Sequence, residues 1–275
     1  MSGKLYVVGT PIGNLGDISE RALETLENCD FIAAEDTRVT LKLLNRFEIK
    51  KPLVSYHEHN KEESGGRIAD RILSGENCAL VTDAGMPAIS DPGEDLVKLC
   101  RENGITVVSV PGPCAFTTAL AISGMPSRRF IFEGFPPSDK KERAELFESL
   151  ANEERTVIFH EAPHRLAKTL SEMFSLIGNR EIAITRELTK IHEEVIITTL
   201  EEASKMFTDD SPKGEFVLIL KGAQRSEETV MTREQAIKYA LDLVKGGESK
   251  TDAAKKAAKE SGLKKGDIYK EIIGE

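Results

Sequence analysis

The stretch LYVVGTPIGNLGD (5–17) sets the fold, because a short apolar run leads directly into a loop rich in glycine and proline. The same pattern recurs at 78–93 (CALVTDAGMPAISDPG) and at 105–115 (ITVVSVPGPCA). In parallel α/β sheets the carboxyl ends of the strands share one edge, and ligands bind there. Glycine and proline allow rigid loops to approach a ligand closely. Each loop alone could be a sharp turn, but three at one edge favour a binding cleft.

Apolar runs and helical stretches alternate throughout the first part of the chain. Further strand candidates occupy 30–35 and 53–56, and several of these runs are continuously apolar, as in strands buried on both faces. Ile18, Ala22, Leu23 and Leu26 share one helical face, and Asp17 is placed to cap the start of that helix. Alternating strands and helices predict a parallel sheet with right-handed crossovers. We therefore predict an α/β domain over residues 1–113.

The pattern changes after a helix expected near 115–124. The runs around 181–198 leave little room for a crossover helix, which predicts a hairpin and hence a mixed sheet. We predict a second α/β domain over 114–222, and the polar segment 223–229 has the composition of a linker. Its strand candidates are 130–135, 156–160, 181–185, 193–198 and 215–220.

Residues 230–275 form the third predicted part, a small module of three short helices similar to a helix-turn-helix. We expect Gly246–Gly247, Gly262 and Gly266 to end the helices. The segment 250–270 carries seven lysines against three acids, although the chain as a whole has a net charge of −9. This asymmetry suits a protein that grips a polyanion at one end, and its alternative is a solvated helix face. The lysines expected to contact phosphates are Lys255, Lys256, Lys259, Lys264 and Lys265.

Composition and motifs exclude several classes of protein. None of the apolar runs approaches the length of a membrane span, and the four cysteines lack the spacing of a zinc site or a disulfide scaffold. We expect a cytoplasmic protein. The first loop reads GxxxGxxG, which is neither the dinucleotide fingerprint nor a P-loop. His57 and His59 could chelate a metal, but no third ligand has recognisable spacing, so no metal site is predicted.

Besides the loop motifs quoted above, the chain contains AAEDTR (33–38), FEGFPP (132–137) and RELTK (186–190). Together these six motifs resemble the tetrapyrrole-methylase superfamily, and in particular its branch that methylates ribosomal RNA. The resemblance runs from about residue 4 to 222, and the basic helical tail resembles a domain appended in that branch. It implies two α/β domains of the class III methyltransferase type, with S-adenosylmethionine bound between them. The three loop motifs among them are GTPIGNLGD (9–17), DAGMPAISDPG (83–93) and VPGPCA (110–115).

The resemblance also implies which residues contact the cofactor. Those of the first loops would lie on the methionine side, and those of the second domain would include a strand-end pair and the adenine side. The alternative for His160 and Glu161 is an ordinary polar pair at a strand end. The implied contacts are Met86, Pro87, Ala88, Ile89, Cys114, Ala115, His160, Glu161, Leu188, Gly214 and Glu215.

Transfer of an activated methyl group requires in-line positioning and activation of a poor nucleophile. The nucleophile implied by the resemblance is a ribose 2′-hydroxyl, so a general base or a polarising cation is expected nearby. Glu35 and Asp36 end a buried strand, where a carboxyl pKa could be raised. Arg38 could contact a phosphate, and Lys190 could stabilise a developing alkoxide. The candidates are Glu35, Asp36, Arg38, His57, His59, Glu187 and Lys190, and the alternative for each is a salt bridge between loops.

The function implied is S-adenosylmethionine-dependent 2′-O-methylation of a cytidine in small-subunit (16S) ribosomal RNA, by a homodimeric enzyme acting on the assembled subunit. One rival is a methylase of a tetrapyrrole precursor or of a modified protein side chain, for which a phosphate-binding tail has no use. Another is a non-catalytic nucleic-acid-binding sensor of S-adenosylmethionine. It would bind the cofactor without turnover.

Overall fold

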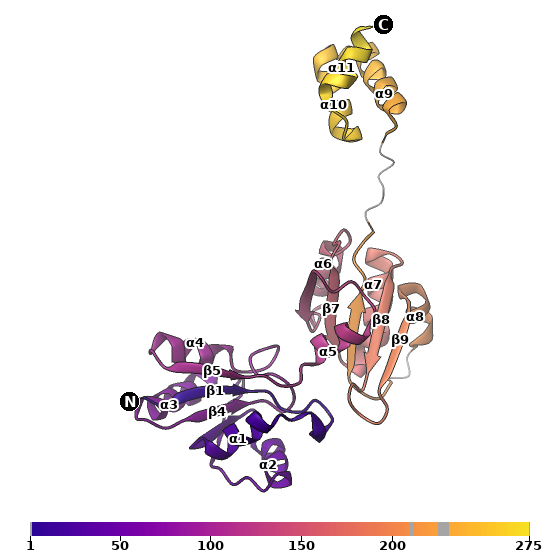
Figure 1. Cartoon of the computed structure of the whole chain (residues 1–275). Helices are drawn as coiled ribbons and strands as arrows, with labels where there is room; N and C mark the ends of the chain where they lie inside the picture. Colours follow the sequence, from indigo (N-terminus) through magenta and orange to yellow (C-terminus); the bar gives the residue numbers. More distant parts are fainter. Residues whose placement is uncertain (1, 209–211, 225–230, 275) are drawn as a thin grey trace. The chain divides into compact units, whose positions relative to one another are not determined.

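The computed structural model describes residues 2–208, 212–224 and 231–274, and it divides the chain into two compact units (Figure 1). The first unit comprises residues 1–223 and contains two sheets, and the second comprises residues 224–275 and is helical. Most of the linker predicted at 223–229 lies outside the described residues. Among those described, none of the helices is both long and apolar enough to cross a bilayer.

The first sheet is parallel throughout, as predicted, with strand order β3-β2-β4-β1-β5. Every crossover returns the chain to the same end of the sheet, so all loops that follow these strands gather at one edge. The central strands β2 and β4 are buried at every position, which explains their continuous apolar sequences. The strands are β1 (Lys4–Val8), β2 (Phe31–Ala34), β3 (Leu53–Ser55), β4 (Cys78–Val81) and β5 (Thr106–Val110).

Two pairs of helices cover the faces of this sheet. The helices α3 (Lys61–Leu73) and α4 (Glu94–Glu102) pack on one face, and α1 (Glu20–Asn28) and α2 (Thr37–Arg46) on the other. The predicted cap of α1 is wrong. The side chain of Ser19 caps that helix, because Asp17 belongs to a preceding 3₁₀ turn, η1 (Leu15–Asp17).

The second sheet is mixed, with strand order β6-β7-β10-β8-β9. The predicted hairpin is confirmed, since β8 and β9 pair in antiparallel register. Only β6 and β7 are parallel, and β10 lies antiparallel between β7 and β8. The strands are β6 (Phe130–Gly134), β7 (Thr156–Glu161), β8 (Glu181–Arg186), β9 (Glu194–Thr199) and β10 (Phe216–Leu220).

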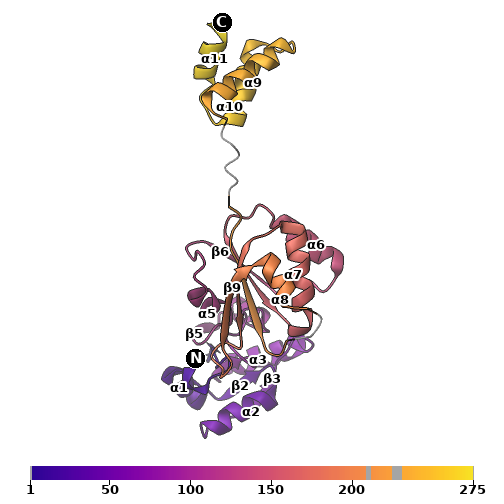
Figure 2. The same cartoon turned by 90° about the vertical axis from the view of Figure 1, so that its right-hand side faces the viewer.

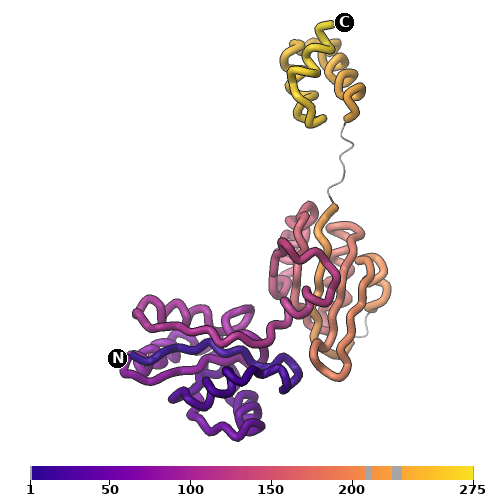
Figure 3. The backbone as a smooth tube through the Cα atoms, viewed as in Figure 1, coloured from indigo at the N-terminus to yellow at the C-terminus, as the bar shows by residue number. Residues whose placement is uncertain are grey.

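The two faces of the second sheet differ in what covers them (Figure 2). On one face pack α6 (Lys140–Ser149), α7 (Pro163–Ile177) and α8 (Leu200–Met206). On the other lies α5 (Ala115–Ile122), which the chain enters directly after β5 (Figure 3). Ile12, from the loop after β1, joins the core under α5, so the first loop packs against the second sheet.

The C-terminal unit contains α9 (Arg233–Lys245), α10 (Lys250–Ser261) and α11 (Lys265–Ile273). Gly246 and Gly262 follow α9 and α10 as predicted, and Gly262 adopts the left-handed conformation of a helix C-terminus. The prediction for Gly266 is wrong, because this glycine lies inside the first turn of α11. The buried side chains of this unit are Ala236, Ala240, Ala253, Ala254, Ala257, Ser261, Ile268 and Ile272.

Candidate functional site

Three loops converge at the carboxyl edge of the first sheet through direct backbone contact. A Cβ atom added at Gly9 would lie 2.7 Å from the Cα of Gly112, and one added at Gly112 would lie 2.7 Å from the carbonyl oxygen of Gly9. Thr10 and Gly85 exchange backbone hydrogen bonds of 2.9 and 3.1 Å, which ties the first loop to the loop after β4. The predicted meeting of the three loops is therefore confirmed, and Gly9 and Gly112 touch through backbone atoms.

The loop after β4 holds an unusual backbone conformation beside this contact. Ala88 and Ser90 have φ values of 65° and 63°, in the left-handed region that residues other than glycine rarely adopt. Strained backbone of this kind persists only where the surrounding structure enforces it, and it is concentrated at ligand sites. Met86 approaches the same centre, since its Sδ would lie 2.7 Å from a Cβ at Gly9. Pro87 is buried, whereas Ile89 is 43% exposed.

Cys114 and Ala115 stand where the third loop enters α5. Cys114 is the N-cap residue of the helix and is free and half-buried. Its carbonyl oxygen accepts hydrogen bonds from the hydroxyls of Thr117 and Thr118. The backbone at the start of α5 is therefore held by its own first turn, which leaves the Cys114 thiol without a structural partner among the described residues.

His160 and Glu161 do not form the predicted pair, because successive residues of a strand face opposite sides of the sheet. The Glu161 carboxylate is buried against α7, where it accepts hydrogen bonds from Thr169 and from the backbone N–H of Ala162 and lies 3.5 Å from Arg165. That side chain is therefore held against α7, and the assignment of Glu161 to the cofactor stays a prediction.

His160 faces the side of the second sheet that bears α5. Its ring packs edge-on against Phe132 and Phe135, with ring centroids 5.1 and 5.3 Å away. Burial lowers the pKa of His160, so the neutral imidazole predominates at neutral pH. Its Nε2 is buried and has no hydrogen-bond partner among the described residues. An unsatisfied buried nitrogen of this kind is costly unless a ligand completes it.

Glu187, Lys190 and Glu215 form a cluster at the end of β8. The ammonium of Lys190 lies 2.9 Å from Glu187 and 3.2 Å from Glu215. Burial acts to lower the pKa of Lys190, but these hydrogen bonds outweigh it and raise the value, so the side chain stays charged. Leu188 is buried next to the cluster. A Cβ at Gly214 would lie 2.7 Å from the Cγ of Glu187, so only glycine fits there.

The remaining predicted carboxylates, Glu35 and Asp36, directly follow β2. Burial raises the pKa of Glu35, as expected, and its carboxylate lies 3.4 Å from the backbone nitrogen of Asp83. The expectation for Asp36 is wrong. This side chain caps α2 and pairs with Arg38 at 2.6 Å, and hydrogen bonds from Arg38 lower its pKa to about 2.

The structure thus separates the predicted catalytic residues into two groups. One group surrounds Glu35, and the other surrounds Lys190. Among the described residues, neither a hydrogen bond nor an ion pair joins the two groups. Gly13 brings the first loop to the second group, because its Cα lies against the side chain of Lys190, where a Cβ would meet the Cγ at 2.5 Å.

His57 and His59 lie with their ring centroids 6.0 Å apart in an edge-on arrangement. The Nδ1 of His57 is buried without a partner. Within the described ranges, the side chains of histidine, cysteine, aspartate and glutamate do not gather in any group of three that could hold a metal ion.

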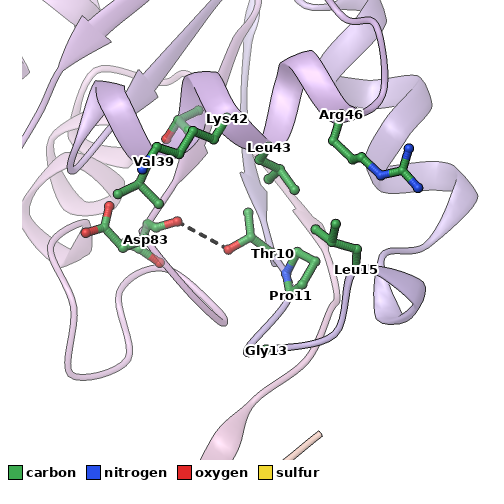
Figure 4. Close-up of a pocket in the computed structure, with 11 residues that line it drawn as sticks. Thr10, Pro11, Gly13, Leu15, Val39, Lys42, Leu43, Arg46 and Asp83 are labelled. Carbon is green, nitrogen blue, oxygen red and sulfur yellow. Dashed lines mark hydrogen bonds between the residues drawn. The ribbon is translucent and has the colours of Figure 1, made fainter. Parts of the chain in front are cut away.

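A pocket of about 320 Å³ lies beside the converging loops, and sequence reasoning missed it (Figure 4). The pocket lies between α2 and the segment after β1, and Asp83 lies at one end of the pocket. The signal that could have revealed it is the spacing of Arg38, Lys42 and Arg46, which places three cations on one face of a helix. The lining residues are Thr10, Pro11, Gly13, Leu15, Val39, Thr40, Lys42, Leu43, Arg46, Thr82 and Asp83.

The predicted RNA-binding lysines fall into two places in the C-terminal unit. Lys255, Lys256 and Lys259 line a hollow at the start of α10. Lys256 is paired with Glu248 at 2.5 Å, and that hydrogen bond raises its pKa. Lys264 and Lys265 lie at the turn between α10 and α11 instead. The structure therefore brings three of the five together.

Comparison with known proteins identifies the family. The sequence profile described as "Tetrapyrrole (Corrin/Porphyrin) Methylases" matches residues 4–204, which is most of the α/β unit. The chain belongs to the tetrapyrrole methylase family. It is a methyltransferase by family, and its fold agrees with a solved uroporphyrin-III-C-methyltransferase from Thermus thermophilus. That structure superposes with a TM-score of 0.56 at 19% identity, over 80% of this chain and 94% of the other.

Two members of the family are much closer in sequence. A Bacillus subtilis protein named ribosomal RNA small subunit methyltransferase I is 47% identical over 97% of this chain and 93% of its own length. A Thermotoga maritima protein of the same name is 49% identical over its whole length but covers 81% of this chain. About a fifth of this chain has no counterpart in the Thermotoga protein, a share that matches the size of the C-terminal unit.

The carboxylate Asp91 yields a pH-dependent prediction. Burial, with the neighbouring charges of Glu35 and Asp83, raises the pKa of Asp91 from 3.8 to about 6. Its contribution to stability is therefore present below about pH 4 and lost as the pH rises through 6. Asp91→Asn cannot ionise and should retain on the order of 1–2 kcal/mol that the wild type loses between pH 4 and pH 7.

Urea denaturation at a series of pH values measures this difference. Asp70→Asn, at an exposed position on α3, is the control and should follow the wild type. An Asp91→Asn curve parallel to the wild type would show that ionisation of Asp91 does not oppose folding.

Proposed function

We propose that this methylase transfers a methyl group from S-adenosylmethionine to the ribose 2′-hydroxyl of a cytidine in small-subunit (16S) ribosomal RNA, and that it acts in the cytoplasm. The reaction class follows from the family. The choice of small-subunit ribosomal RNA rests on the names of its relatives from Bacillus subtilis and Thermotoga maritima, which are similar to this chain over 97% and 81% of its length. The cytidine 2′-hydroxyl rests on the resemblance of the sequence motifs. The observation that supports this position for the site is the backbone contact of Gly9 with Gly112, beside the strained loop after β4.

The residues at this contact fit S-adenosylmethionine. The absence of Cβ atoms at Gly9 and Gly112 lets the loops after β1 and β5 lie against each other, and the unpartnered Nε2 of His160 offers a buried polar contact. We assign Met86, Pro87, Ala88 and Ile89 to the methionine side, and Leu188, Gly214 and Glu215 to the adenine side, with Cys114, Ala115 and His160 between them. When bound, the sulfonium supplies an activated methyl group.

The protein's own contribution would be to orient the ribose and to manage one proton. Lys190 stays protonated between two carboxylates, so it would act as a fixed positive charge and not as a base. Glu35 is suited to accept a proton, because burial raises its pKa toward the working pH. Asp36 and Arg38 neutralise each other, and with a pKa near 2 Asp36 is a poor base. Glu187 would hold Lys190 in place.

The C-terminal unit would supply contacts to the RNA backbone. Lysines hold phosphates without reading sequence, and a chain without tryptophan and with only 5% aromatic residues has little means to stack bases. We therefore expect the enzyme to recognise the shape of the assembled small subunit. The lysines proposed for these contacts are Lys255, Lys256, Lys259, Lys264 and Lys265.

The first test offers isotopically labelled S-adenosylmethionine to the protein with small ribosomal subunits, naked rRNA or a tetrapyrrole precursor. After digestion of the RNA to nucleosides, we expect the label in 2′-O-methylcytidine, with more from subunits than from naked rRNA. Label in the tetrapyrrole alone would overturn the substrate. Cofactor binding without label in any of the three would argue for the sensor alternative.

The second test addresses the cofactor site through Gly112. Gly112→Ala places a methyl group against the backbone of Gly9, so the loops must separate. We expect the dissociation constant of S-adenosylmethionine, measured by calorimetry, to rise at least tenfold while the circular dichroism spectrum stays unchanged. Gly66→Ala, inside α3 with open space around it, is the control. Equal affinity in both variants would place the cofactor elsewhere.

The third test removes the C-terminal unit. A chain truncated after Ala223 keeps both sheets and all residues assigned to the cofactor. We expect its affinity for small subunits to fall more than tenfold, and its affinity for S-adenosylmethionine to change less than twofold. Loss of both affinities together would show that the unit is needed for the fold of the α/β unit.

We also expect a homodimer formed through the α/β unit. Ile191 precedes the edge strand β9 and Ile197 lies in it, and their side chains are 98% and 59% exposed, which is unusual for large apolar side chains. Covering this edge would remove it from water. Sedimentation at micromolar concentration should give about twice the 30.3 kDa mass of one chain. A single species of the monomer mass would refute the dimer.

A further inference from the structure

We infer that the pocket between α2 and the segment after β1 binds one nucleotide of the RNA substrate, with its base against the apolar wall and its phosphate held by Lys42 and Arg46. The inference rests on the proposed function and names the subsite that would hold the substrate. A volume of about 320 Å³ lies at the lower end of the ~300–1,000 Å³ range of small-ligand pockets.

The apolar wall comes from both sides of the pocket. Leu15 and Val39 are 43% and 37% exposed, although both are large apolar residues, and Leu43 lies between them (Figure 4). Covering exposed aliphatic side chains with a flat ring removes their apolar surface from water, which is favourable in free energy. A nucleobase is such a ring, and it would lie between α2 and the first loop.

Two cations flank this wall without partners. Within the described parts of the chain, Lys42 and Arg46 form neither an ion pair nor a hydrogen bond, even though the protein carries nine more negative than positive charges. Arg38, one turn earlier on the same helix face, is occupied by Asp36. Two free cations one helical turn apart suit a phosphate group and oppose the positively charged sulfonium of S-adenosylmethionine.

The buried hydroxyl of Thr40 provides independent evidence that a ligand enters. Thr40 lines the pocket with 3% of its surface exposed, and its Oγ1 has no hydrogen-bond partner among the described residues. The neighbouring Thr10 is different, because its hydroxyl donates to the carbonyl oxygen of Thr82. An unpaired hydroxyl destabilises a folded chain, so its presence at the pocket wall is explained if a ligand atom pairs with it.

The pocket adjoins the proposed cofactor site through a single loop. Thr10, Pro11 and Gly13 line the pocket, whereas the preceding Gly9 contacts Gly112 at the cofactor loops. None of the residues assigned to the cofactor lines the pocket, and Gly13 also contacts Lys190. A nucleotide held here would therefore lie next to the groups proposed for the reaction.

The test compares two double variants of the full chain that lose the same charge. Lys42→Ala/Arg46→Ala removes the cations of the pocket, and Lys50→Ala/Lys98→Ala removes two exposed lysines of the same α/β unit. We measure the dissociation constants of cytidine 5′-monophosphate and of small ribosomal subunits, the KM for subunits, and the dissociation constant of S-adenosylmethionine. The pocket variant should weaken binding of both RNA probes roughly tenfold or more, with cofactor binding unchanged. The control should stay within twofold of the wild type.

Thr40→Val separates a ligand role from a structural one. The substitution keeps the shape and removes the unpaired hydroxyl, so the melting temperature should stay equal or rise. Binding of cytidine 5′-monophosphate should nevertheless weaken several-fold. A lower melting temperature with unchanged nucleotide binding would show that the hydroxyl serves the fold.

The outcomes distinguish this inference from the proposed function. If the wild type methylates RNA but the two double variants behave alike, the pocket is not the subsite and the function stands. If the wild type labels no RNA but the pocket variant loses nucleotide binding, the pocket stands and the substrate of the reaction is wrong. Absence of nucleotide binding by the wild type, together with equal KM values in both double variants, would overturn the pocket.

Discussion

The close approach of two backbone segments, at Gly9 and Gly112, is the constraint on which the rest of the site depends. Because neither position tolerates a Cβ atom, the loops after β1 and β5 touch without side chains between them. The hydrogen bonds between Thr10 and Gly85 then fix the loop after β4 to the loop after β1. A parallel sheet brings strand ends to one edge, but only glycine lets these loops close to contact distance.

Ion pairing and burial divide the carboxylates of the site into those with a lowered pKa and those with a raised pKa. Where a carboxylate has a cation or a helix N-terminus beside it, as Asp36 does, its pKa falls and its charge is fixed. Where burial dominates, as at Glu35 and Asp91, the pKa rises, and that of Asp91 reaches about 6. The fold thus places fixed charge at the ends of β2 and β8 and titratable charge between β2 and β4.

Much of this architecture was predictable from sequence, because strands buried on both faces give continuous apolar runs and their loops follow from chain order. The parallel sheet, the mixed sheet and the convergence of three loops were found in this way. The direction in which each side chain points was not predictable from sequence. Glu161 faces α7 because of strand alternation, and Asp36 caps α2, a helix whose periodicity was not recognised. The pocket on α2 went unseen for the same reason. Residues 10 and 83 approach α2 only after the chain has folded.

The core of the C-terminal unit has a consequence for how that part of the molecule responds to heat. Its buried side chains are mostly alanines, each of which removes little apolar surface from water, and the unit is small. The free energy of unfolding of this unit is therefore only a few kilocalories per mole, much less than that of the two-sheet unit. A polyanion that bound in the lysine-lined hollow would contribute its binding energy directly to folding. In calorimetry this unit would melt first and alone, and added polyanion would move that transition while leaving the later one in place.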